Sequence, residues 1–375
     1  MGVDIILNTR LNFEVARGIG LDLNGPLDTG GAKRGADMAT AAEAREWAQT
    51  HLRGIADSLI TPFSGTDGDD IDYEALRTLV RYCLVDLDHD GLWLVSGLAE
   101  WWALTIDERK KVAEVSIDEA RKVKSSAFLQ VCTIGLSAKD TVDLTLHAQD
   151  IGADIVYLQN PVMEVHGGQG ILDFFRYVAD RTDIALGMFN SPSSGYEMSP
   201  AEVVRIAEEL PAMCAMKDAS TLPGHGMAVS RMAPQALVVW DVSSPLAPTY
   251  NSGYVQAGLQ APCMLGGMAY LTETPADKRF TNWFNLVLES KLDEARDYYF
   301  SADIDGPVSH GLTYTQLPQR PGYWTHWGSA FKYSAELLGL PVGDYPYSRP
   351  PQLKLSEEQQ ARIEDAYLRS GLIQA

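Results

Sequence analysis

Short apolar segments alternate with longer amphipathic segments along most of the chain. Residues 72–87, for example, place Leu76, Leu79 and Val80 on one side of a helical pattern, which is typical of a helix with one buried face. Residues 92–95 are apolar throughout, as expected for a strand that is covered on both sides. The alternation predicts a repeat in which each strand is followed by a helix.

Eight such units follow one another between residues 53 and 290. Eight strand–helix units joined by short loops favour a (β/α)8 TIM barrel, an α/β fold, over a doubly wound sheet. The predicted strands are residues 55–61, 92–95, 128–133, 155–159, 184–190, the run that ends at Lys217, 237–241 and 261–265. The predicted helices between the first six strands are residues 72–87, 105–123, 137–151, 171–180 and 199–210.

Two flanking regions do not follow this repeat. Residues 1–52 contain a stretch rich in glycine, aspartate and proline and then a polar helix at 40–51, which predicts an N-terminal extension. Residues 291–375 predict a C-terminal helical region that is packed outside the barrel. Its expected helices are residues 291–300, 329–338 and 356–370.

Composition and charge narrow the possible partners. The 375 residues are 46% hydrophobic and 21% charged, as in a globular protein with a sizeable core, and the formal net charge is −20. Neither nucleic acid nor an anionic membrane surface is an expected partner, because both require clustered Lys and Arg. No apolar run approaches the length of a membrane span, and charged residues such as Asp4 and Arg10 interrupt the first 30 residues. We therefore expect a cytoplasmic protein.

The sequence also predicts neither a metal site nor a bound cofactor. The four cysteines lie far apart, which predicts reduced core residues, and His, Asp and Glu do not occur with the spacing of metal ligands. The glycine pairs 167–168 and 266–267 lack the context of a phosphate-binding loop.

Lys217 is the residue with the clearest chemical potential. It interrupts a short apolar run at the predicted end of the sixth strand, just before Asp218. Desolvation disfavours the ammonium form of a lysine, and a neutral amine can attack a carbonyl carbon and form a Schiff base. The alternative is a structural ion pair between Lys217 and Asp218. The stretch alone does not separate the two.

The residues at the other strand ends favour the first interpretation. They include Thr61-Pro62-Phe63, Glu100 to Thr105, Phe189-Asn190-Ser191-Pro192 and Lys217-Asp218-Ala219. In order and spacing they resemble the T-P-F, G-T-T-G-E-x-x-x-L-T, Y-N-x-P and I-K-E/D-A motifs of the dihydrodipicolinate synthase and N-acetylneuraminate lyase family. The resemblance extends from Ile55 to Leu372. It implies a class I aldolase barrel, a Schiff base on Lys217 and assembly into a homo-oligomer, a tetramer or dimer.

The chain departs from the family where a proton must move. Gly97 and Leu98 replace the two threonines that grip the pyruvate carboxylate, and Phe189 replaces the tyrosine that completes the family's proton relay. Ser194 stands in place of an arginine that often holds a substrate carboxylate. Phe189 has no proton to exchange, so another acid or base must act, or the family reaction has been lost.

Several residues are candidates for the altered site. Glu164, His166 and Tyr196 are candidate acid–base residues beside Lys217 and Phe189, although a solvent-exposed loop is the more ordinary setting for His166. The candidate substrate-binding residues are Thr61, Gly97, Leu98, Trp101, Asn190 and Asp241.

The apolar replacements suggest a bulky apolar or aromatic substrate. Trp101, Leu98 and Phe189 would make the pocket less polar than one built for pyruvate alone, although Trp101 fits a subunit interface equally well. We expect a Schiff-base lyase that acts on a 2-oxo acid or related carbonyl compound. The alternative is a catalytically altered barrel that binds a ligand or regulates another protein. A third option is a Schiff-base enzyme whose substrate has no carboxylate.

Overall fold

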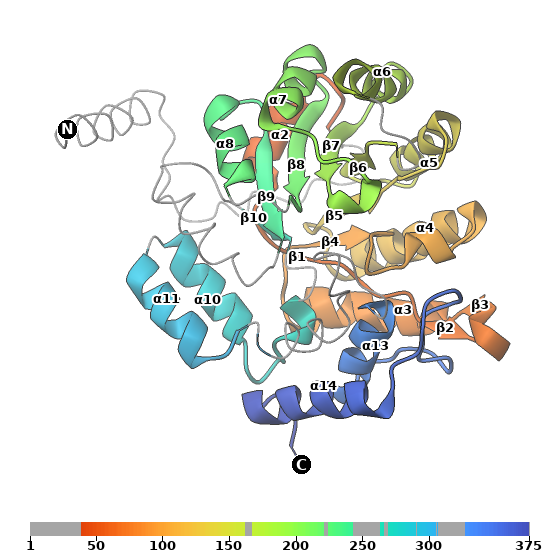
Figure 1. Ribbon diagram of the computed structural model, residues 1–375, viewed down its shortest axis with the longest axis vertical. Coiled ribbons are helices and arrows are strands. Elements are labelled where there is room, and N and C mark those ends of the chain that lie inside the picture. Colours follow the sequence, from red (N-terminus) through yellow and green to blue (C-terminus); the bar gives the residue numbers. More distant parts are fainter. Residues whose placement is uncertain are drawn as a thin grey trace.

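Eight parallel strands form a closed barrel in the computed structural model, which describes residues 39–161, 167–220, 224–242, 263–265, 269–289, 291–304, 306 and 327–374 (Figure 1). Around the barrel the strand order is β1, β10, β9, β8, β7, β6, β5, β4, and β4 closes onto β1. The strands are β1 Gly54–Asp57, β4 Gly91–Leu94, β5 Phe128–Cys132, β6 Ile155–Gln159, β7 Ala185–Asn190, β8 Met213–Asp218, β9 Val238–Val242 and β10 Cys263–Leu265. The predicted TIM barrel is thus confirmed.

Helices surround the strands, as Figure 1 shows. They are α3 Tyr73–Arg81, α4 Ile106–Val123, α5 Ala138–Asp150, α6 Gly168–Ala179, α7 Pro200–Glu209 and α8 His225–Met232. Helices α4 and α7 begin with capping boxes, in which Thr105 and Ser199 each exchange hydrogen bonds with a glutamate three residues later. The helix predicted over residues 72–87 is observed as α3 followed by a π-helical turn, Tyr82–Asp86, which keeps Cys83 and Leu84 buried.

Helix α2, Ala44–His51, packs against the amino-terminal end of the barrel. Trp47 and Ala48 belong to the same buried cluster as Phe128, Ile155 and Ala185, which are the first residues of β5, β6 and β7. Because parallel strands begin at one end of a barrel and finish at the other, α2 covers the end opposite to Lys217. Burial of its apolar face explains why this otherwise polar helix is stable.

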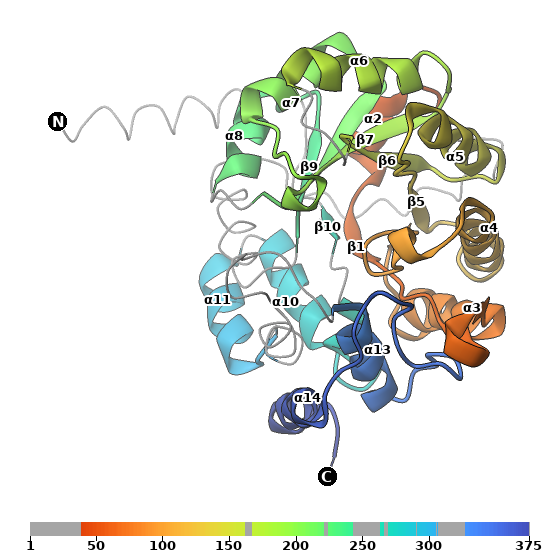
Figure 2. The same cartoon turned by 45° about the vertical axis from the view of Figure 1, so that its right-hand side comes forward.

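The last third of the chain adds helices beside the barrel (Figure 2). Helix α10, Arg279–Leu288, packs on α11, Leu292–Ser301, through an aromatic cluster of Trp283, Phe284 and Tyr299. Helices α13, Trp327–Leu337, and α14, Glu357–Ser370, pack on each other. A short antiparallel pair, β2 Phe63–Ser64 and β3 Asp70–Ile71, follows β1. No helix in the described part of the chain is long and apolar enough to cross a membrane.

A buried charged triad joins β1 to this C-terminal part of the chain. His89 Nδ1 contacts Asp57 Oδ2 and His89 Nε2 contacts Glu273 Oε1, each at 2.5 Å, and all three side chains are at most 1% exposed. Burial opposes the charge on His89, but the two carboxylates outweigh it and raise the pKa of His89 to about 10. His89 is therefore an imidazolium at neutral pH.

The triad leads to a prediction about stability. His89→Gln should lower the free energy of unfolding by about 3–5 kcal/mol at pH 7, because it leaves two buried carboxylates without their cation. The folded-state pKa is raised, so this contribution is complete below about pH 6.5 and is lost as the pH rises through about 10. Urea unfolding of both proteins across this range measures the difference.

His147→Gln is the matched control, since His147 is only half-buried and its Nε2 lies 3.5 Å from Glu114 Oε1 near the surface. It should cost less than about 1 kcal/mol. An equal loss in the two variants would contradict the assignment of a buried charged triad.

Candidate active site

Lys217 lies next to last in β8, with its amine against two aromatic rings. Its Nζ is 4.0 Å from the ring centre of Phe189 and 4.4 Å from that of Trp93, and the residue is 8% exposed. The Cα of Lys217 pairs with Phe189 in β7 and with Trp240 in β9. The amine is thus held in an apolar setting at the carboxyl end of the strands, where TIM barrels carry their active sites.

The alternation of side chains along β8 separates Lys217 from Asp218. Ala215, two residues before Lys217, belongs to the cluster inside the barrel, whereas Met216 packs in the layer between the strands and the helices. The Asp218 carboxylate accepts hydrogen bonds from Ser220 N at 3.2 Å and Asn190 Nδ2 at 3.4 Å, and it contacts His225 Nδ1 at 3.0 Å. The Lys217–Asp218 ion pair is therefore replaced by an Asp218–His225 pair.

His225 fixes the end of β8 to the segment before α7. Its Nε2 donates to the backbone oxygen of Met198 at 2.8 Å, while Nδ1 faces Asp218. Burial opposes protonation, but the hydrogen bonds to Asp218 and Met198 raise the pKa of His225. Because both ring nitrogens face acceptors, the protonated ring is favoured, and His225 positions the strand end.

Two predicted substrate-binding residues have their polar atoms occupied within the fold. Asn190 Oδ1 accepts from Met198 N at 2.9 Å, which shapes the turn after β7. Thr61 Oγ1 donates to the backbone oxygen of Ala99 at 2.8 Å and so orders the loop after β4. Both residues are fully buried, and they support the barrel mouth by bracing its loops.

The loop after β4 carries three other predicted residues. Gly97 is half-buried, Leu98 is 9% exposed, and Trp101 is half-buried with the Arg109 guanidinium 5.3 Å from its ring centre. Burial lowers the pKa of Arg109 to about 10, so Arg109 still carries a charge at neutral pH. Trp101 therefore packs against α4 through a cation–π contact.

The structure describes two of the remaining candidate residues, Tyr196 and Asp241. The Tyr196 phenol donates to Glu202 Oε1 at 2.7 Å, at the start of α7, and this hydrogen bond raises its pKa. The proton of the phenol is thus committed to that carboxylate. Asp241 lies in β9, where its Cα pairs with Asp218. Glu164 and His166 lie outside the described residues.

A buried ion pair locks the loop after β4 to helix α13. Lys332 Nζ lies 2.8 Å from Glu100 Oε1, and both side chains are fully buried. Burial lowers the pKa of Lys332 to about 8 although Glu100 acts in the opposite direction, so the Lys332 amine is still largely protonated at pH 7. Lys332 Nζ also donates to the backbone oxygen of Tyr347 at 2.9 Å. Helix α13 therefore helps to position Gly97 and Leu98.

Four residues at this end of the barrel were not singled out in the sequence. Trp93 supplies one of the two rings against the amine, and Gln159 pairs in register with Phe189 in the layer of Lys217. Ser58 and Ser96 share a hydrogen bond at the ends of β1 and β4. The alternation of side chains along each strand was the available sequence signal for these residues. Only the register between neighbouring strands places their side chains together.

Cys132 and Cys214 are unsuited to nucleophilic chemistry. Burial raises the pKa of Cys132 and of Cys214 to about 12, although Lys217 acts in the opposite direction on Cys132. Both are therefore neutral thiols at pH 7. Within the described ranges, no group of three or more His, Cys, Asp or Glu is arranged to hold a metal ion.

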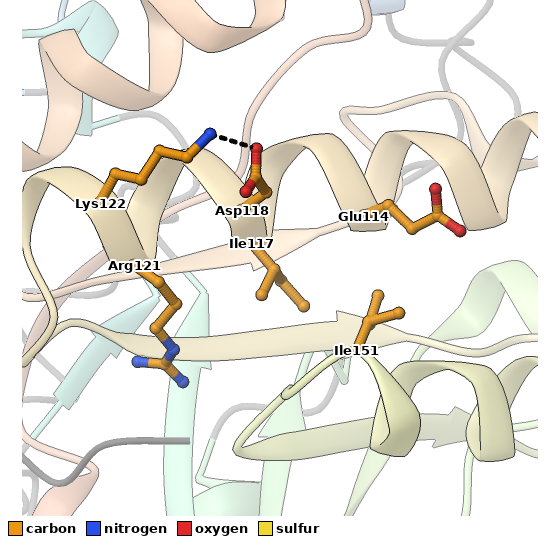
Figure 3. Close-up of a pocket in the computed structure, with 6 residues that line it drawn as sticks. All are labelled: Glu114, Ile117, Asp118, Arg121, Lys122 and Ile151. Atoms are coloured by element: carbon orange, nitrogen blue, oxygen red, sulfur yellow. Dashed lines mark hydrogen bonds and ion pairs between the residues drawn. The ribbon is translucent and has the colours of Figure 1, made fainter.

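A surface depression lies elsewhere, on the outer side of α4 (Figure 3). Its walls are Glu114, Ile117, Asp118, Arg121, Lys122 and Ile151. The charged groups there are engaged with one another, since Lys122 Nζ lies 2.6 Å from Asp118 and Arg121 lies 2.8 Å from Asp154. None of these residues adjoins Lys217, and the depression is not part of the candidate site.

The fold and the buried strand-end lysine define a TIM barrel with the layout of Schiff-base aldolases. The chain matches the model of the dihydrodipicolinate synthetase family over residues 51–245, more than half of its length. The chain belongs to the dihydrodipicolinate synthetase family.

Curated relatives agree with this assignment. The chain is 24% identical over 325 residues to a 4-hydroxy-tetrahydrodipicolinate synthase of Methanococcus aeolicus, which covers 86% of this chain and 100% of that protein. It is 28% identical to an uncharacterized DapA-like lyase of Thermococcus onnurineus, over 46% of this chain and 57% of that protein. The match with a similar lyase of Pyrococcus horikoshii is 34% identical over 41% of this chain and 50% of that protein. The chain thus spans only about half the length of these two lyases.

Solved structures share the fold at low identity. A dihydrodipicolinate synthase from Aquifex aeolicus superposes with a TM-score of 0.71 at 21% identity, over 85% of this chain and 98% of that chain. YagE, a prophage protein of the same family from Escherichia coli K12 solved in complex with pyruvate, also gives 0.71 at 21% identity, over 86% and 99%.

The Glu100–Lys332 pair can be tested through stability. Glu100→Gln should destabilise the protein by about 3–5 kcal/mol, because it leaves a buried ammonium group without its partner. The double variant Glu100→Gln with Lys332→Met should recover most of that loss, since it removes both charges. Denaturant unfolding of the two single variants and the double variant measures the coupling.

The exposed pair Lys111–Glu114, at 3.0 Å, provides the control. Lys111→Met should cost less than about 1 kcal/mol. If the losses of Glu100→Gln and Lys332→Met simply add in the double variant, the two side chains are not coupled.

Proposed function

We propose that this chain is a lysine Schiff-base lyase that acts on a carbonyl substrate with a bulky apolar or aromatic part. The observation that carries the proposal is the position of Lys217: its amine lies at the carboxyl end of β8, inside the barrel, against Trp93 and Phe189. The matched family and the order of strand-end motifs support the same role for this lysine.

The chemistry follows from the amine. Neutral Nζ attacks the carbonyl carbon, and the carbonyl oxygen leaves as water together with the two amine protons; the imine nitrogen then takes up one proton from solvent. When a bond to the neighbouring carbon breaks, its electron pair moves into the carbon–carbon double bond of an enamine, and the C=N electrons move to nitrogen. The protein thus provides its own electron sink.

The surroundings of Lys217 support an apolar substrate part. Trp93 and Phe189 form an edge-to-face pair with ring centres 5.5 Å apart, and Leu98 stands where the family has a threonine. These side chains favour the burial of hydrocarbon or aromatic surface over a small polar acid. Activity assays determine the exact substrate and whether the reaction is a cleavage, a condensation or a dehydration.

Proton transfer is where this chain differs from its relatives. Phe189 has no hydroxyl, and the Tyr196 phenol is bonded to Glu202. We therefore propose that imine formation is retained and that the subsequent proton transfer uses water or a group of the loop that holds Glu164 and His166. Because Phe189 supplies no proton donor, we expect proton transfer to be the slower part of the cycle.

The second candidate is a barrel that binds its ligand without turnover. The absence of the threonine pair and of the tyrosine favours it, whereas the retained Lys217 opposes it. A ligand-binding protein should bind reversibly and independently of the Lys217 amine. The expected cytoplasmic location, the homo-oligomeric state and the division at residues 52 and 290 also stay predictions.

Borohydride trapping tests the proposal. Incubation with 2-oxo-4-phenylbutanoate, pyruvate or 3-phenylpropanal followed by borohydride should add the mass of one probe less one oxygen atom. The reason is that an imine forms with loss of water and is then reduced. Peptide mass spectrometry should place the added mass on Lys217.

Lys217→Arg is the control, since it keeps a cation but cannot form the imine. It should show no adduct while a surface variant such as Lys111→Arg reacts like the wild type. If no member of a broad panel of 2-oxo acids and aldehydes is trapped, the lyase proposal fails. If Lys217→Arg still binds the probes by calorimetry with unchanged affinity, the ligand-binding alternative is favoured.

Phe189→Tyr should accelerate turnover of any trapped substrate by at least about tenfold, because it restores a phenol beside the imine. Imine formation should change less than about twofold, since the amine is unaltered. The comparison of the turnover rate with the trapped fraction measures the effect. Phe189→Leu, which adds no proton donor, is the control, and an equal acceleration in that variant would contradict the explanation.

A further inference from the structure

Two carboxylates lie at the carboxyl end of β8, next to Lys217 in the chain. Asp218 is buried on the face of the strand opposite to the Lys217 amine, and its Oδ2 lies 3.0 Å from His225 Nδ1. Glu197 accepts a hydrogen bond from Ser220 Oγ at 2.7 Å, and its charge also acts on His225. The residue after the candidate nucleophile therefore belongs to an acidic group of side chains.

His225 supplies the opposite charge to this group. Its Nδ1 faces Asp218 and its Nε2 faces the backbone oxygen of Met198 at 2.8 Å, so only the doubly protonated ring donates in both directions. Burial opposes this form, but Asp218, Met198 and Glu197 together raise the pKa of His225. The contact between Asp218 and His225 thus joins a carboxylate to a ring whose protonated form is favoured, and the pair has little net charge.

The charge on Asp218 affects the chemistry of Lys217 because the two residues are neighbours in a buried strand. A lysine amine must be neutral to attack a carbonyl carbon. A nearby carboxylate without a cation favours the ammonium form, and charges interact over longer distances where water is excluded. Lys217 is 8% exposed and Asp218 is 7% exposed, so solvent screens their interaction weakly.

We propose that His225 is a positioning residue that acts through charge: its cation neutralises Asp218, so that the Lys217 amine stays available as a neutral nucleophile near neutral pH. The inference rests on the proposed lyase function and adds to it a residue outside the barrel interior. His225 acts through Asp218 and not on the substrate, because both of its ring nitrogens are engaged with Asp218 and Met198.

The other titratable residues around the end of β8 do not replace this cation. Burial raises the pKa of Cys132 to about 12, so its thiol stays neutral although the charge of Lys217 acts on it. In β9 the Cα of Asp241 pairs with that of Asp218, which brings another acidic residue to the same level of the barrel. Among the residues that the structure describes here, His225 is the cation that contacts Asp218.

Asp218→Asn separates the effect of charge from that of shape. The side-chain oxygen that accepts from Ser220 N and Asn190 Nδ2 is retained, and the introduced N–H group can donate to His225 Nδ1. A neutral His225 with its proton on Nε2 keeps the hydrogen bond to Met198. This variant removes both charges of the pair, whereas His225→Gln removes the cation and leaves the carboxylate.

The pH dependence of imine formation tests the inference. Timed borohydride quenching measures the rate with 2-oxo-4-phenylbutanoate and with 3-phenylpropanal from about pH 6 to about pH 10. His225→Gln should move the midpoint of the profile upward by about one pH unit, which lowers the rate below the midpoint about tenfold. The rate at the alkaline end should stay within about twofold of that of the wild type, which also shows that the variant is folded.

Two comparisons complete the test. The neutral aldehyde should show the same shift as the 2-oxo acid, because the effect arises in the amine and not from repulsion of a carboxylate on the probe. Asp218→Asn, alone or combined with His225→Gln, should move the midpoint by less than half as much as His225→Gln, because neither variant leaves a carboxylate without its cation.

Three results would overturn the inference and leave the lyase proposal intact. They are an unchanged midpoint in His225→Gln, an equal shift in the double variant, and a rate that falls by the same factor at every pH, as expected of a purely structural role. A shift seen with the 2-oxo acid but not with the aldehyde would do the same. If the wild type traps neither these probes nor any of the panel, the lyase proposal fails, and the inference fails with it.

Discussion

The placement of the Lys217 amine between two aromatic rings is the constraint on which the candidate site depends. A lysine inside a barrel loses hydration, and the faces of Trp93 and Phe189 offset part of that loss while they keep the amine close to the barrel axis. The alternation of side chains along β8 directs Asp218 to the opposite face of the strand, where its carboxylate contacts His225. Lys217 is therefore kept apart from the carboxylate that follows it in the sequence, and its amine lies against the two rings.

The fold was readable from the sequence because strand and helix signals agree over most of the barrel. Predicted and observed bounds coincide for β6 and differ by one residue for β4, because an apolar run has clear ends. The π-helical turn after α3 was not predictable, since its residues have the same apolar spacing as the helix before it. Likewise, the packing of α2 under the barrel depends on Trp47 meeting residues that are distant in the chain.

The candidate site was predictable only in part. Lys217 and Phe189 were found because family motifs surround them, and the structure places them in register. The contacts of Trp93, Ser58 and Lys332 arise from the closure of the barrel and the return of the C-terminal helices. No local pattern reports such contacts, because they join segments that lie far apart in the sequence. Polar residues such as Asn190 were assigned to ligand binding although the fold itself uses their atoms.

The packing of α2 bears on the order of product release in a lyase of the proposed kind. Because side chains fill the barrel interior and α2 covers its amino-terminal end, the substrate and products of such a lyase would share the carboxyl-terminal face. A fragment bonded to Lys217 stays anchored until water hydrolyses the imine, whereas the other fragment is free to diffuse away. Release would then be ordered, with the unbonded fragment first and the carbonyl fragment last, and the carbonyl product would compete with fresh substrate for the same amine.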